Sequence, residues 1–107
     1  MKTFKDLEFK NKEMGLGKIS RIGFDNGWGV SVVIGPYTYG GKDGLYELAV
    51  LNNDQIHYDN PVANGDVVGY LRPEDVTDAM AVIQKFEKTI AEDSDFMYNW
   101  IKDKSGR

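Results

Sequence analysis

The chain has 107 residues, a formal net charge of −4 and no cysteine. This length gives room for one domain with one core, and a content of 41% apolar and 28% charged residues excludes wholesale disorder. The absence of cysteine excludes thiol catalysis, disulfides and cysteine-ligated metal centres, and it suits a reducing compartment.

The N-terminal segment, residues 1–17, gives the weakest structural signal. It contains lysines but no apolar stretch, so we expect no signal peptide here. Phe4, Leu7 and Phe9 could dock a short strand or turn against the rest of the domain.

Residues 18–34 predict a β-hairpin, because apolar residues alternate on both sides of the turn sequence Asp25-Asn26-Gly27. A two-residue loop would place Trp28 on the face opposite to Phe24. A three-residue loop pairs Phe24 with Trp28 and gathers the large apolar side chains on one face. Since a slip of one residue turns every side chain over, burial favours the three-residue loop, with Gly27 in the left-handed conformation.

Further strands follow a loop that is rich in glycine. Residues 35–44, GPYTYGGKDG, predict a mobile loop, and Leu45 to Leu51 reads as a central strand because it is apolar on both faces except at Glu47. Short strands are expected at Gln55–Tyr58 and Val67–Leu71, separated by turn residues.

The sequence Arg72-Pro73-Glu74-Asp75 predicts a helix start, because proline suits the first helical position and acids favour the N-terminus. Apolar residues then recur at helical spacing to about Ala91. The stripe consists of Val76, Met80, Ile83 and Ile90, with Phe86 beside it. Two continuations stay open. Either Ser94 caps a second short helix with Met97, Trp100 and Ile101 on its apolar face, or one helix runs from Pro73 to about Lys102.

These elements predict an α+β fold in a single domain, residues 1–107. It comprises the N-terminal segment 1–17, a β-meander over 18–71 and a helical C-terminal region over 73–103. We expect an antiparallel sheet of four to five strands followed by an amphipathic helix, or two, packed on one face.

No constellation for catalysis or metal binding emerges. His57 is the single histidine, and no serine or threonine stands in a nucleophile motif beside it. Glu47 could be buried with a raised pKa, project into solvent or pair with Arg21. No cofactor and no metal are therefore expected, and the chain is not expected to be an enzyme.

The candidate binding site lies in the glycine-rich loop and the start of the strand after it. Tyrosine on a glycine-containing loop offers contact area at little cost in conformational entropy. Trp28, Tyr46, Tyr58 and Tyr70 flank the loop, and Trp28, Tyr46 and Tyr70 are also ordinary residues for a sheet. The predicted binding residues are Tyr37, Tyr39, Lys42, Asp43 and Tyr46.

The charge distribution narrows the kinds of partner. The first 21 residues hold six Lys/Arg and three Asp/Glu, so the remainder carries −7. Residues 52–78 hold six acids and one base, Arg72. Such a surface repels nucleic acids and anionic membranes, and no apolar run approaches the ~20 residues of a membrane helix. We expect no nucleic-acid or membrane partner; a protein with a basic surface fits better.

The stretches GWGVSVVIGPYTYGGKDGLYELAVL and HYDNPVANGDVVGYLRPEDV resemble a group of small proteins encoded by tailed bacteriophages, over roughly residues 22–90. The resemblance implies an accessory phage protein in the cytoplasm of the bacterial host. Small accessory phage proteins are often antagonists of host defence, including anti-CRISPR proteins. The expected function is stoichiometric binding to a host protein; the alternative is a small-ligand module that sequesters a nucleotide signal, with Lys42, Arg21 and Arg72 as phosphate contacts.

Overall fold

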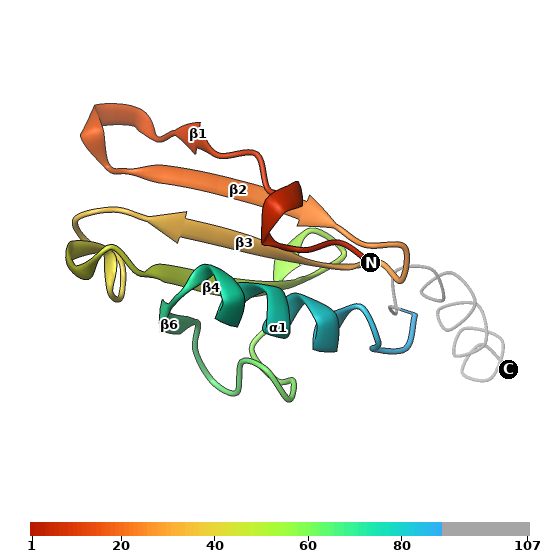
Figure 1. The fold of residues 1–107 in the computed structure, drawn as a ribbon. Coiled ribbons are helices and arrows are strands. Elements are labelled where there is room, and N and C mark those ends of the chain that lie inside the picture. The colour runs from red at the N-terminus through yellow and green to blue at the C-terminus, as the bar shows by residue number, and fades with distance from the viewer. Residues whose placement is uncertain (89–107) are drawn as a thin grey trace, which may run out of the picture.

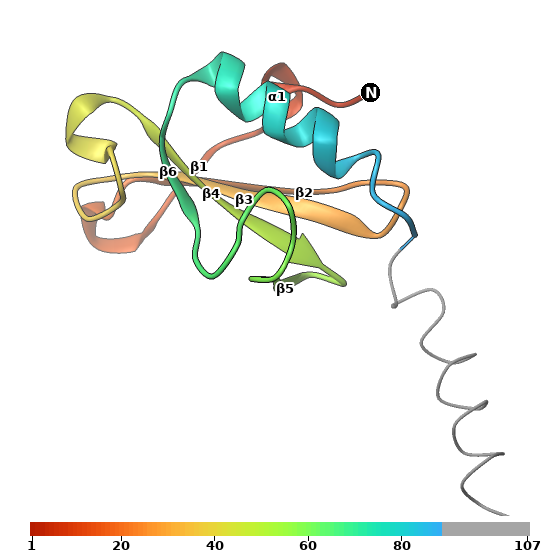
Figure 2. The same cartoon turned by 90° about the horizontal axis from the view of Figure 1, so that it is seen from below.

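The structure, a computed structural model, describes residues 1–88, which form an antiparallel sheet with one α-helix across one face (Figure 1 and Figure 2). The predicted α+β class is confirmed. The strands are β1 (Lys10–Asn11), β2 (Lys18–Gly23), β3 (Trp28–Ile34), β4 (Tyr46–Asn52), β5 (Gln55–Ile56) and β6 (Val68–Leu71); the helices are α1 (Pro73–Ile83) and the short η1 (Phe4–Asp6), η2 (Glu13–Gly15) and η3 (Gly41–Asp43).

The sheet has six strands in place of the four or five expected, because the N-terminal segment adds β1 at the edge beside β2. The order runs β1-β2-β3-β4-β5, and β6 returns to pair with β4. The predicted meander therefore holds only as far as β5. Both β5 and β6 use the same edge of β4, β5 at Leu51 and Asn52 and β6 at Tyr46 and Leu48.

The β2–β3 hairpin has the predicted three-residue loop. Ile22 pairs with Val30, and the amide of Phe24 donates a hydrogen bond to the carbonyl oxygen of Trp28 at 2.7 Å. Gly27 has a φ of +83°, in the left-handed region that this loop requires. Burial of the apolar face therefore selected this register, since the alternative loop would have moved Trp28 to the other face.

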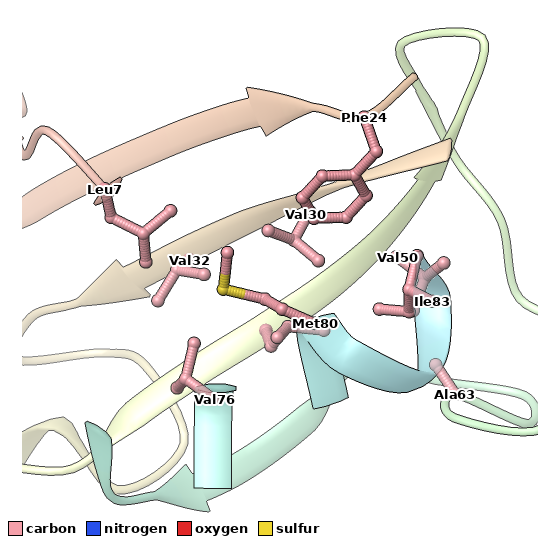
Figure 3. Close-up of a cluster of buried hydrophobic side chains, with 10 residues drawn as sticks. Leu7, Phe24, Val30, Val32, Val50, Ala63, Val76, Met80 and Ile83 are labelled. Atoms are coloured by element: carbon pink, nitrogen blue, oxygen red, sulfur yellow. The ribbon is translucent and has the colours of Figure 1, made fainter. Parts of the chain in front are cut away.

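The core lies between this face of the sheet and α1 (Figure 3). Val30 faces Val50 and Val32 faces Leu48 across β3 and β4, and all four side chains are fully buried. The helix contributes the predicted stripe, which is fully buried at Val76, Met80 and Ile83. Proline at the first position and an Asp75 carboxylate that accepts from the Arg72 amide at 2.9 Å start the helix as predicted.

The helix is shorter than the prediction that extended it to Ala91, because hairpin side chains end it at Ile83. Asn26 Nδ2 donates to the carbonyl oxygens of Ile83 at 2.9 Å and Phe86 at 3.0 Å, and Trp28 Nε1 donates to that of Glu87 at 2.9 Å. The carbonyl oxygens of Ile83, Phe86 and Glu87 therefore accept hydrogen bonds from hairpin side chains, in place of the amides of a continued helix. A single helix over 73–102 is wrong, since residues 84–88 are not helical. Ile90 and the second helix from Ser94, with Met97, Trp100 and Ile101, lie outside the described residues.

The N-terminal segment packs against both the sheet and the region of α1. Leu7 is buried in the core, and Phe4 packs against Phe9 and Tyr46 with ring centroids 5.8 and 5.1 Å away. The Gln84 side chain accepts from the Lys2 amide and donates to the Lys2 carbonyl, each at 2.8 Å. The segment is therefore an integral part of the domain.

Candidate functional site

The glycine-rich loop between β3 and β4 is a compact unit held by its own hydrogen bonds. The Thr38 hydroxyl accepts from the Gly35 amide at 3.0 Å and donates to the Gly35 carbonyl at 3.1 Å. The turn η3 follows, flanked by Gly40 and Gly44 in the left-handed region. A Cβ at Gly41 would overlap the carbonyl oxygen of Gly35. Close backbone packing therefore requires the glycine there, and these contacts argue against the mobility that the composition suggested.

Two hydrogen bonds of Tyr39 fasten the loop to the sheet. Its amide donates to Oε1 of Glu47 on β4 at 3.0 Å, and its carbonyl oxygen accepts from the amide of Tyr70 on β6 at 3.0 Å. Glu47 is thus a structural anchor of the loop. Of the alternatives left open for Glu47, the pairing with Arg21 is not the one found, because Arg21 bonds Asp54 at 3.2 Å.

Tyr70 is the residue whose role the sequence did not reveal. It adopts a φ of +58°, which is uncommon for any residue with a Cβ and costs of order 1–3 kcal/mol. The pairing of β6 with β4 is irregular between Tyr46 and Leu48, opposite this position. The irregular strand leaves the Tyr70 side chain 62% exposed beside the loop.

The loop and β6 together enclose an open hollow of about 300 Å³. Tyr37, Lys42, Asp43 and Tyr70 contribute side chains to its wall. Tyr37 is the most exposed of these aromatic rings at 85%. Tyr39 is half exposed and does not line the hollow, but it lies between the lining residues Thr38 and Gly40 in the chain and bonds Tyr70 of β6. We call Tyr37, Tyr39, Lys42, Asp43 and Tyr70 the tyrosine surface; it lies at the end of the sheet where β3 ends and β4 begins (Figure 1).

Of the five predicted binding residues, Tyr37, Lys42 and Asp43 line the hollow, Tyr39 adjoins it in the same loop, and Tyr46 lies elsewhere. Its ring lies on the core side of β4, with Phe4 at 5.1 Å and Phe9 at 5.6 Å between ring centroids. The alternation along β4 places Tyr46 on the same face as the buried Leu48. Tyr46 therefore stabilises the N-terminal segment, and Tyr70 takes its place in the site.

The chemistry of the tyrosine surface is that of contact and hydrogen bonding. One ammonium group, Lys42, and one carboxylate, Asp43, line the hollow beside phenol rings and exposed backbone. Over residues 1–88 no group of three or more His, Asp or Glu side chains is placed to hold a metal ion. Within the same residues no helix has the length and apolar character needed to cross a membrane.

Comparisons of the chain with protein-family models, with curated proteins and with solved structures give no match. The resemblance to tailed-phage proteins therefore stays a prediction. The case for function depends on the geometry of the surface itself.

Proposed function

We propose that this chain is a non-catalytic binding protein that engages a partner protein in a stoichiometric complex through the tyrosine surface. In the phage context that the sequence resemblance implies, the partner is a component of a host defence system with a basic surface. The complex would form in the cytoplasm of the bacterial host and inhibit that component.

The conformation of Tyr70 is the observation that carries this proposal. A strained backbone persists only where the surrounding structure imposes it, and such positions gather at functional sites. Here the strain presents a large aromatic ring to solvent, next to Tyr37 and Tyr39. A side chain buried in the core would explain the strain by packing, but that of Tyr70 is 62% exposed. The irregular pairing of β6 with β4 imposes this conformation, and its result is an exposed ring that a partner can contact.

Rigidity of the loop supports the same function. Tyr39 donates to Glu47 and accepts from Tyr70, so the backbone at Tyr39 and Tyr70 is fixed before any partner arrives. Preorganised tyrosine lowers the entropy cost of association and is enriched among residues that dominate binding energy. The net charge of −4 would speed encounter with a basic partner, to an extent that falls with salt.

The alternative, a module that sequesters a nucleotide signal, has weaker support. It requires cations around the aromatic rings to neutralise phosphate. Lys42 is the cation in the wall of the hollow, and Asp43 lies beside it. Arg21 pairs with Asp54 and lines a different cavity, and Arg72 does not line the hollow either.

The test is phage plaque formation on bacteria that carry defined defence systems, with and without expression of the chain. The double substitution Tyr37→Ala and Tyr39→Ala is expected to abolish protection of the phage while the thermal midpoint stays near that of the wild type. Tyr58→Ala is the matched control, since Tyr58 is half exposed and lies outside the hollow. Protection by the double variant equal to that by the wild type would rule out this surface.

Native mass spectrometry of the chain purified from infected cells separates the two functions. A co-purifying protein, lost in the double variant, supports the proposal. A retained nucleotide supports the alternative.

A further inference from the structure

A second hollow, of about 370 Å³, lies at the opposite end of the sheet and has aromatic walls. Trp28, at the start of β3, lines it together with His57 and Phe86. The rings of His57 and Phe86 each lie 4.9 Å from the Trp28 ring between centroids and are nearly perpendicular to it. In Figure 1 this end carries the β2–β3 turn and the end of β4, away from the loop that bears Tyr37. We call it the aromatic hollow. Its volume is in the range of small-ligand sites.

Hydrogen bonds fix Trp28 and Phe86 in place. Trp28 Nε1 donates to the Glu87 carbonyl at 2.9 Å, and the Trp28 amide donates to Asn26 Oδ1 at 3.1 Å. The same Asn26 side chain binds the Phe86 carbonyl at 3.0 Å. The turn asparagine therefore holds the backbone at both aromatic residues, and the Trp28 ring is held by its own bond to Glu87, so this part of the wall exists before any ligand binds.

His57 is held equally firmly by Asn60. Asn60 Oδ1 accepts from the amides of Val62 at 3.0 Å and Ala63 at 2.8 Å, which fixes the orientation of its side-chain amide. Asn60 Nδ2 then donates to His57 Nδ1 at 3.2 Å and to the His57 carbonyl at 3.1 Å. Since Nδ1 is the acceptor, a neutral His57 carries its proton on Nε2. The imidazole is thus an oriented wall of the hollow.

Polar groups with unused hydrogen-bonding capacity line the rest of the hollow. The side chains of Asn52, Asp59 and Glu87 make no hydrogen bond or ion pair with other residues of the described chain. Two carboxylates and one ammonium group, that of Lys88, line the hollow, so its charge is negative when His57 is neutral. Aromatic faces beside carboxylates attract cations.

We infer that the aromatic hollow binds a guanidinium group. A guanidinium is planar and weakly hydrated, stacks on aromatic rings and donates in a fork to carboxylates, and Asp59 and Glu87 provide these acceptors. An anionic ligand would meet two carboxylates, and an apolar one would leave them without partners. The inference concerns a site separate from the tyrosine surface and holds whether or not that surface binds a host protein.

The test uses tryptophan fluorescence. The chain has two tryptophans, so Trp100→Phe leaves Trp28 as the single reporter. N-acetyl-arginine amide is titrated at low salt against the uncharged isostere N-acetyl-citrulline amide. The arginine compound is expected to change Trp28 emission saturably, and the citrulline compound is not. A short glycine peptide with one central arginine is titrated in parallel. Binding of N-acetyl-arginine amide but not of the peptide identifies a small-molecule site, and binding of both compounds identifies a site for an arginine side chain of a protein.

Charge variants make the test specific. Asp59 and Glu87 are exposed, so Asp59→Asn with Glu87→Gln keeps the fold. The double variant should weaken binding by up to about fivefold for each carboxylate, the upper end of the range for an exposed ion pair. Glu8→Gln with Asp78→Asn changes the net charge equally at exposed positions outside the hollow and should leave affinity unchanged. Absence of saturation, equal response to citrulline, or equal loss in both double variants would overturn the inference.

Discussion

The strained conformation of Tyr70 predicts an inverted order of stability between two small substitutions. Tyr70→Ala and Tyr70→Gly remove the same ring, but alanine keeps a Cβ in the left-handed region at φ +58° and glycine does not. In an ordinary strand glycine is less stable than alanine by about 0.5–1 kcal/mol. Here the left-handed backbone penalises alanine by about 1–2 kcal/mol. Glycine should therefore be the more stable variant, by up to about 1.5 kcal/mol.

Urea denaturation followed by circular dichroism measures this difference. The midpoint should be higher for Tyr70→Gly with an unchanged slope, and a difference of about 1 kcal/mol would correspond to roughly 4–8 °C in the thermal midpoint. Because both variants lack the ring, both should lose partner binding, which separates the backbone effect from function. A Tyr70→Ala variant that is more stable than Tyr70→Gly by about 0.5–1 kcal/mol, as in an ordinary strand, would show that the position is unstrained, and the main argument for the site would fall.

Three further predictions concern the elements that position the two hollows. Gly27→Val should cost more than about 1 kcal/mol of unfolding free energy, because it places a β-branched residue at φ +83°. The control is Gly23→Val, at a strand position where a Cβ meets open space, and equal thermal midpoints of the two variants would contradict the hairpin geometry. Ile83→Ala should cost about 2–5 kcal/mol as a fully buried residue; a loss under about 0.5 kcal/mol in chemical denaturation would mean that α1 leaves the sheet exposed. Asn26→Asp should lower the free energy of unfolding by about 1–3 kcal/mol despite its matched shape, because a carboxylate cannot donate to the Ile83 and Phe86 carbonyls. A thermal midpoint equal to that of the wild type would refute this role of Asn26.

Local patterns in the sequence determined the fold class, the hairpin register and the helix start. The register followed from period-two alternation, since one loop length alone buries Phe24, Val30 and Val32 together. The start of α1 followed from Pro73 and the acids after it, and its stripe from the spacing of Val76, Met80 and Ile83. Each of these signals acts between residues close in the chain, so the sequence displays it directly.

Contacts between residues distant in sequence decided where α1 ends and which residues form the candidate site. The helix ends at Ile83 because Asn26, 57 positions earlier, binds its carbonyl, and no pattern near Ile83 announces this. Tyr46 left the predicted site because Phe4 and Phe9 cover it, and Tyr70 entered the site because the irregular pairing of β6 forces it into the left-handed region beside the loop. Composition marked the loop as rich in tyrosine and glycine, but which rings reach solvent depends on the packing of strands far apart in sequence, and that packing exists only in the folded chain.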